Sequence, residues 1–175
     1  MPDKARQPDA PALQRVRALI ERVVDVVGVW TSWIALVIVG LMATNVLLRY
    51  LFSVGTVWSQ ELEWHLLVPL ILFGMSYALR HGEHVRVDIF HTRFSDRVKV
   101  FVDLASSVLV VAISALIIWF SVKYVQQAYV IDEGSPDPGG IPHRYLIKSL
   151  IPIGFTLLLL QGIASAIASI EKLRS

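Results

Sequence analysis

The chain has 175 residues and a formal net charge of +2; 55% of its residues are hydrophobic, 17% are charged, and none is cysteine. The absence of cysteine excludes a disulfide framework, a thiolate metal site and a cysteine nucleophile. The sequence also lacks G-x-S-x-G, H-E-x-x-H and phosphate-loop motifs and any nucleic-acid-binding module, so we expect neither an enzyme nor a nucleic-acid-binding protein.

Four long apolar stretches dominate the sequence. No Asp, Glu, Lys or Arg occurs in residues 26–48, 64–79, 104–122 or 149–170. A helix needs about 20 apolar residues to cross the hydrocarbon layer of a bilayer, and the second stretch is long enough if it begins near residue 57. We therefore predict an all-α integral membrane protein with four transmembrane helices, at about 26–48, 57–79, 103–124 and 147–170.

We predict two regions in the chain. Residues 1–11 contain three prolines among alternating charges, which predicts a disordered cytoplasmic tail. Residues 12–175 are predicted to form the four-helix transmembrane domain. From Ala12 the apolar residues follow helical spacing, which predicts a basic amphipathic N-terminal helix. This helix either lies on the membrane surface or continues directly into the first span, and Gly28 is the natural place for a break.

Lysine and arginine predict the orientation. Twelve of them lie in the N-terminal tail, in the loop between the second and third spans and at the C-terminus, whereas four lie on the other side. Cytoplasmic segments carry the excess of positive charge, so we expect both termini in the cytoplasm. The loop between the third and fourth spans is then periplasmic.

The segment LRHGEHVRVDIFH, residues 79–91, is the richest in candidate ligands. His81 and His84, with Glu83 or His91, have the spacing of a divalent-metal site. Gly82 and the surrounding cations instead favour a positively charged cytoplasmic surface that meets lipid headgroups or a partner chain. We expect that surface to include Arg80, His84, Arg86 and Asp88.

A second pair of histidines offers another alternative. His65 and His143 both lie near the outer ends of predicted spans, where the two imidazoles could ligate a haem iron. No other feature of the sequence supports a haem, and we expect no cofactor.

The stretch VWSQELEWHLL places two carboxylates where the second span enters the membrane. An ionisable group at that depth normally has a partner, and Arg49 closes the first span only a short loop away. We predict an ion pair between Arg49 and Glu61, with Glu63 as the second choice. The alternatives are that both carboxylates reach headgroup water, or that they bind a coupling ion.

The end of the fourth span carries a face of small residues: Gly162, Ser165, Ala166 and Ser169. Helices in lipid associate through close contacts over such faces. The face therefore predicts packing against another subunit or, equally, packing within the four-helix unit.

Three segments resemble one known family. NVLLRY, WSQELEWHLLVPLILFGMSYALRHGEHVRVDIF and SPDPGGIPHRYLIKSLIPIGFTLLLLQGI are similar in order and spacing to the small, DctQ-type permease subunit of tripartite ATP-independent periplasmic (TRAP) transporters. The resemblance covers roughly residues 40 to 165. The SPDPGG loop and the L-E-W entry look closer to the subgroup labelled mannitol/chloroaromatic, whose cargoes are 2-oxo or related carboxylic acids.

The resemblance implies a non-catalytic scaffold in the bacterial inner membrane. Its partners would be membrane lipids, a large permease subunit that holds the substrate and sodium sites, and a periplasmic binding protein that delivers an organic acid. No catalytic, substrate-binding or metal residue is then expected in this chain. A cytochrome-like redox subunit and a stand-alone assembly factor with four spans are the alternative functions.

Overall fold

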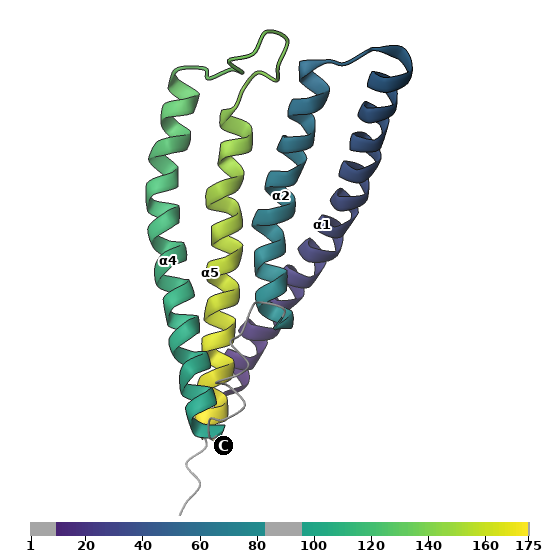
Figure 1. Ribbon diagram of the computed structural model, residues 1–175. Helices are drawn as coiled ribbons and strands as arrows, with labels where there is room; N and C mark the ends of the chain where they lie inside the picture. The colour runs from purple at the N-terminus through teal and green to yellow at the C-terminus, as the bar shows by residue number, and fades with distance from the viewer. Residues whose placement is uncertain (1–9, 83–95, 175) are drawn as a thin grey trace, which may run out of the picture.

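The computed structural model describes residues 10–82 and 96–174, and within these ranges every regular element is a helix. The helices are α1 (Ala10–Phe52), α2 (Val57–His81), α4 (Asp96–Val130) and α5 (Tyr145–Arg174) (Figure 1). Each is long and apolar enough to cross a membrane, which confirms the predicted all-α fold with four membrane-spanning helices. The predicted disordered tail falls almost entirely outside the described residues.

The amphipathic N-terminal stretch and the first span form one uninterrupted helix. α1 has 43 residues, which corresponds to about 65 Å at about 1.5 Å per residue, roughly twice the thickness of the hydrocarbon layer. Gly28 does not break this helix. A Cβ atom at position 28 would collide with the Tyr77 ring of α2, so the glycine allows α1 to approach α2 closely.

Both ends of α2 are capped. Thr56 is the N-cap residue, and its hydroxyl oxygen accepts a hydrogen bond from the Ser59 N–H at 3.3 Å. Gly82 adopts a left-handed conformation with φ of 72°, and its N–H donates to the Ala78 carbonyl oxygen. Because the helix starts at Val57, Glu61 and Glu63 lie in its first two turns.

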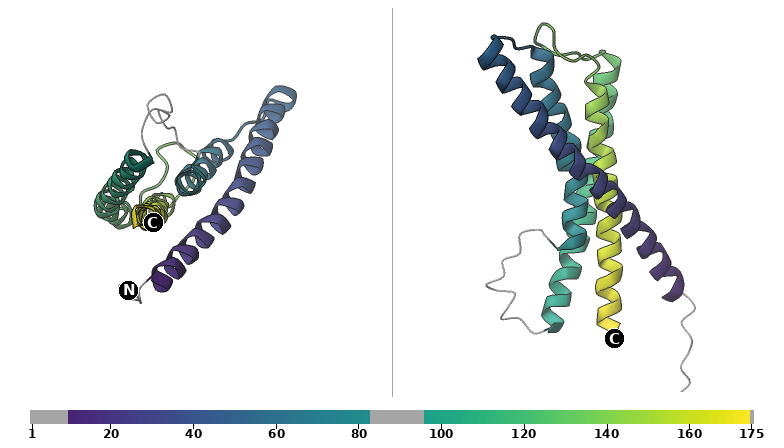
Figure 2. Two further views of the ribbon diagram at one scale, coloured as in Figure 1. Left: turned by 90° about the horizontal axis from the view of Figure 1, so that it is seen from below. Right: turned by 90° about the vertical axis from the view of Figure 1, so that its right-hand side faces the viewer.

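The helices form an open layer. Their order across the layer is α4, α5, α2, α1 (Figure 1). α1 crosses the neighbouring helices obliquely, so that its first turns also pack against α5 (Figure 2). The loops at residues 53–56 and 131–144 lie at one end of the layer, which we call the loop end. The start of α1 and the end of α5 lie at the other end, the termini end.

The contact between α4 and α5 follows a repeat of seven residues. The buried residues of α4 are all small and are spaced seven apart: Ser107, Ser114, Ser121 and Ala128. This spacing is typical of helices that pack side by side at a shallow left-handed angle. Small side chains along the seam let the two backbones approach closely.

An open layer leaves most large apolar side chains uncovered. In α1, Trp30 is 72% and Trp33 60% exposed, and in α4, Trp119 is 70% and Phe120 62% exposed. Such surfaces are unfavourable in water. In a bilayer they are covered by lipid or by the helices of a partner.

Candidate functional site at the loop end of the layer

Glu61 anchors the loop between α4 and α5. Its side chain is only 13% exposed and accepts three hydrogen bonds from that loop. The donors are the Ser135 hydroxyl, the Ile141 N–H at 2.5 Å and the Arg144 guanidinium at 3.1 Å. Because these residues lie more than 70 positions from Glu61, the carboxylate ties α2 to the opposite half of the protein.

The loop sequence makes this anchoring possible. The run GSPDPGGIP, residues 134–142, is rich in residues that stop a helix and turn the chain. Gly139 has φ of 82°, a conformation that favours glycine. At Gly140 a Cβ atom would lie 2.6 Å from Glu61 Oε2, so the missing side chain leaves room for the carboxylate.

The base of the loop is fixed to α5 and α4. The Arg144 N–H donates to the Glu133 carbonyl oxygen at 2.8 Å, which closes the loop on itself. The Glu133 carboxylate pairs with Lys148 near the start of α5. The Lys148 ammonium also lies 4.0 Å from the centre of the Tyr124 ring of α4, a cation–π contact.

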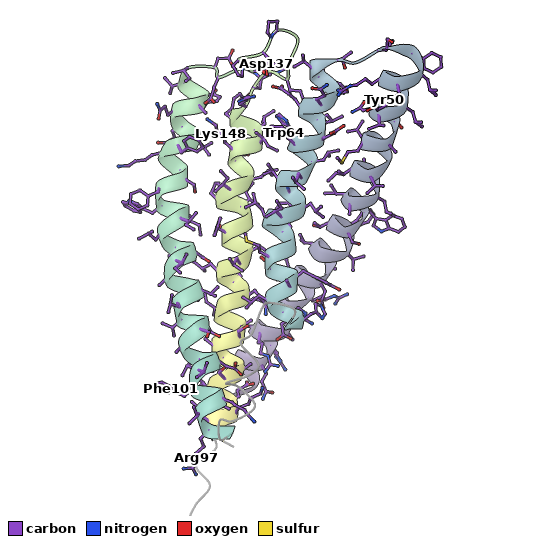
Figure 3. The ribbon with its side chains drawn as sticks, in the orientation of Figure 1. Tyr50, Trp64, Arg97, Phe101, Asp137 and Lys148 are labelled. Carbon is purple, nitrogen blue, oxygen red and sulfur yellow. The ribbon has the colours of Figure 1, made fainter. Side chains whose placement is uncertain are left out.

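A cavity of about 330 Å³ lies between the first turns of α2 and this loop. Its polar and aromatic lining comes from both elements: Gln60, Glu61, Trp64, His65, Asp137 and Arg144. Asp137 lies in the loop and Trp64 on α2 (Figure 3). His65 Nδ1 is 2.7 Å from the Glu61 carbonyl oxygen. A carbonyl oxygen only accepts, so Nδ1 carries the proton and a neutral His65 keeps Nε2 as an acceptor.

The ion pair predicted between Arg49 and Glu61 is not formed. Glu61 pairs with Arg144, and among the described residues the Arg49 side chain makes no ion pair. Arg49 lies beside Gly55 in the α1–α2 loop. The prediction was wrong because it considered only the neighbouring helix, whereas the folded loop brings a cation and two further donors to the carboxylate.

Glu63 also takes a partner other than Arg49. Its carboxylate accepts a hydrogen bond from the Asn45 side chain of α1 at 2.6 Å. The same Asn45 amide group donates to the Ser59 carbonyl oxygen at 3.4 Å. Together these bonds join α1 to the first two turns of α2, and they give the Glu63 carboxylate a partner near the hydrocarbon.

A second polar cluster lies at the termini end, where α1 meets α5. Arg17 forms an ion pair with Glu21 one turn further along α1 at 2.9 Å. Arg17 also pairs with Glu171 near the end of α5 at 2.6 Å. The first pair has the spacing that favours helix formation, and the second fixes the start of α1 to the last turns of α5.

The same cluster extends to the end of α2. Arg80 lies 3.0 Å from Glu21 and also pairs with Asp25, both on α1. His81 Nε2 lies 3.2 Å from Asp25. Of the residues predicted to form the cytoplasmic surface, the structure thus places Arg80 between α1 and α2, while His84, Arg86 and Asp88 lie outside the described residues.

The structure describes some of the histidines that the sequence offered as metal or haem ligands. Among the described residues no group of three or more His, Asp or Glu side chains has the arrangement of a metal site. Glu83, His84 and His91 of the proposed metal set lie outside that part of the chain. Of the proposed haem ligands, His65 bonds to a backbone carbonyl oxygen, and His143 Nδ1 lies 3.1 Å from Asp132.

The predicted small-residue face of α5 packs at Gly162 inside the chain. A Cβ atom at Gly162 would lie 3.0 Å from Val111 and 3.1 Å from Val110, both on α4. Ser169 is also buried, whereas Ser165 and Ala166 are partly exposed. The sequence left open whether this face packs against another subunit or within the four-helix unit. Gly162 packs within the unit.

Arg80 gives a quantitative test of the termini-end cluster. Arg80→Ala leaves Glu21 and Asp25 without their shared cation, so we expect it to lower the stability of the protein. The same substitution should cost less stability when it is made in the Glu21→Ala variant. The expected coupling between the two substitutions is about 1 kcal/mol, because both side chains are partly buried. Thermal unfolding of the detergent-solubilised protein measures it. Lys123→Ala on the exposed side of α4 is the matched control, and strictly additive losses would contradict the pairing.

Comparisons with known proteins identify the family. The sequence profile described as "Tripartite ATP-independent periplasmic transporters, DctQ component" matches residues 38–172. The chain is 27% identical over 122 residues to the sialic acid TRAP transporter permease protein SiaT of Haemophilus influenzae, covering 69% of this chain and 19% of SiaT. It is 27% identical over 140 residues to the ectoine TRAP transporter small permease protein TeaB of Halomonas elongata, covering 77% of this chain and 69% of TeaB.

The matched region covers most of the described helices but not residues 10–37 of α1. Residues 38–172 include residues 38–52 at the loop end of α1, all of α2 and α4, and α5 almost to its end. They also include the loop-end residues Glu61 and Arg144 and the seam residue Gly162. Because the profile matches well over half of the sequence, this chain belongs to the DctQ component family of the tripartite ATP-independent periplasmic transporters.

Proposed function

We propose that this chain is the small, non-catalytic scaffold subunit of a sodium-coupled secondary transporter in the bacterial inner membrane. In this proposal a periplasmic binding protein delivers an organic acid to a large permease subunit, and the present chain supports that subunit. The observation that carries the proposal is the family match over residues 38–172. The names of SiaT and TeaB, both permease proteins of TRAP transporters, point the same way.

The proposed orientation puts the termini end in the cytoplasm and the loop end in the periplasm. Both ends of the described chain lie at the same end of the layer (Figure 2). Twelve of the 16 Lys and Arg residues belong to segments that the proposal places in the cytoplasm. The loop anchored on Glu61 then faces the periplasm, where the binding protein would arrive.

The open layer is suited to a scaffold. The outer faces of α1 and α4 expose large apolar side chains that the chain itself does not cover, including Leu36, Leu47, Leu109 and Leu116. Such faces can pack against the helices of a large permease subunit or against lipid. The two polar clusters and the α4–α5 seam hold the layer together from within, so the outer faces remain available to partners.

The cargo is proposed only at the level of chemical class. SiaT and TeaB are named for different solutes, sialic acid and ectoine, yet each is 27% identical to this chain in the aligned residues. We propose a 2-oxo or related carboxylic acid, based on the resemblance of the SPDPGG loop and the L-E-W entry to the mannitol/chloroaromatic subgroup. The large subunit and the binding protein would select it.

Co-purification tests the partnership. An affinity-tagged form of this chain, expressed together with its proposed large permease subunit, is expected to carry that subunit through two chromatographic steps in mild detergent. A tagged, unrelated protein with four membrane spans is the control. Recovery of this chain alone, under conditions in which the large subunit is present in the same membranes, would contradict the proposal.

A further inference from the structure

We propose that the cavity at the loop end binds the headgroup of a phospholipid that carries a primary ammonium group, that is, an ethanolamine phospholipid. Its acyl chains would lie along the exposed face of α2. The proposal concerns a ligand site in this chain itself, so it goes beyond the scaffold function and is independent of the transported substrate.

The position of the cavity points to a lipid. It lies beside the first turns of α2, where the helix enters the apolar layer, and Trp64 at its edge is 73% exposed. Tryptophan at this depth typically sits at the level of lipid headgroups. Leu67 and Ile71, which are 44% and 53% exposed, follow Trp64 on the same face of the helix. An apolar strip therefore leads from the cavity into the hydrocarbon.

The size of the cavity suits a headgroup and excludes a whole lipid. Its volume of about 330 Å³ is at the lower end of the range of about 300–1,000 Å³ for small-molecule sites. A phosphate and an ethanolamine fit in such a space. The acyl chains must remain outside, where the strip on α2 can receive them.

The lining can recognise both charges of this headgroup. A guanidinium has five N–H donors. Arg144 gives one of them to Glu61 at 3.1 Å, and its side chain is 31% exposed. The remaining donors can therefore bind a phosphate. The Asp137 carboxylate makes no ion pair within the described residues, so it can accept from an ammonium group. His65 Nε2 is a second acceptor, and the face of Trp64 attracts a cation.

The charges of the lining also discriminate between headgroups. The lining holds two carboxylates, Glu61 and Asp137, and one guanidinium, so phosphatidylglycerol, which has no cation to offset its phosphate, is repelled overall. The quaternary ammonium of phosphatidylcholine has no N–H and cannot donate to Asp137 or His65. A primary ammonium offsets the charge of its own phosphate and also donates hydrogen bonds to these acceptors. The expected order of retention is ethanolamine, then choline, then glycerol lipid.

Native mass spectrometry of the full chain tests the site. Delipidated protein in detergent is mixed with equal amounts of phosphatidylethanolamine, phosphatidylcholine and phosphatidylglycerol that have identical acyl chains. We expect about fivefold greater retention of the ethanolamine lipid, the equivalent of one favourable charged contact at a partly exposed site. Equal retention of all three lipids by the wild-type protein would overturn the proposal, and this comparison needs no variant.

Two matched pairs of variants locate the site. Asp137→Asn should remove the preference for the ethanolamine lipid, whereas Asp132→Asn, on the same loop but outside the cavity, should preserve it. Trp64→Leu should lower retention of all three lipids, whereas Trp58→Leu, another exposed tryptophan near the start of α2, should not. Equal effects within either pair would overturn the assignment, as would displacement of the lipid by equimolar soluble phosphoethanolamine.

Discussion

Replacing Glu61 by alanine is expected to detach the α4–α5 loop from α2. The carboxylate accepts hydrogen bonds from the Ser135 hydroxyl, the Ile141 N–H and the Arg144 guanidinium, and its removal leaves all three without this acceptor. The three donors are partly buried, and a donor shielded from water that loses its acceptor costs more than the loss of one exposed ion pair. We expect a lower unfolding temperature and faster hydrogen exchange of the Ile141 amide.

Four further variants separate this account from simpler ones. Glu61→Gln keeps one acceptor oxygen and should have an intermediate effect. Glu63→Ala loses only the contact with Asn45 and should leave Ile141 exchange unchanged. Arg144→Ala should weaken the loop, whereas Arg49→Ala should not, because Arg49 does not pair with Glu61. Equal effects of the two arginine variants would contradict the observed pairing.

Replacing Gly162 by leucine is expected to destabilise the isolated chain. The Cβ atom alone would approach Val111 and Val110 to 3.0 and 3.1 Å, and the rest of the leucine has no room in the seam between α5 and α4. Overpacking of a close-packed contact typically costs about 1–3 kcal/mol. Thermal unfolding of the detergent-solubilised chain, without any partner, measures the loss.

The matched control is Gly40→Leu. At Gly40 of α1 a Cβ atom would meet nothing within 4 Å, so leucine there is expected to leave the isolated chain as stable as the wild type. Should Gly162→Leu affect only the recovery of a complex and not the isolated chain, the small-residue face would belong to a subunit contact. The placement of Gly162 against α4 would then be wrong.

The helices were predictable because each one has its own signal in the sequence. A membrane span is identified by a run of uncharged residues, and those runs lie within the observed helices. Whether the N-terminal amphipathic stretch joins the first span was not predictable, since a glycine can either break a helix or permit close packing. At Gly28 the deciding fact is the Tyr77 ring of α2, a contact made only in the folded chain.

The polar contacts were harder to predict, because most of them join distant residues. Glu61 was identified as a carboxylate that needs a partner, but that partner lies on a loop 83 positions later. The pairing of Arg80 with Glu21 depends in the same way on how α1 crosses α2. Two signals could have been found: the Arg17–Glu21 pair at a spacing of four, and the α4 residues Ser107, Ser114 and Ser121 at a spacing of seven.

Transport by the separate and combined subunits tests the scaffold proposal most directly. Proteoliposomes with an inward sodium gradient and the loaded binding protein outside would contain this chain alone, the large permease subunit alone, or both. We expect uptake of the organic acid only when both subunits are present, and no uptake by this chain alone. Sodium-driven uptake by this chain without the large subunit would contradict the account.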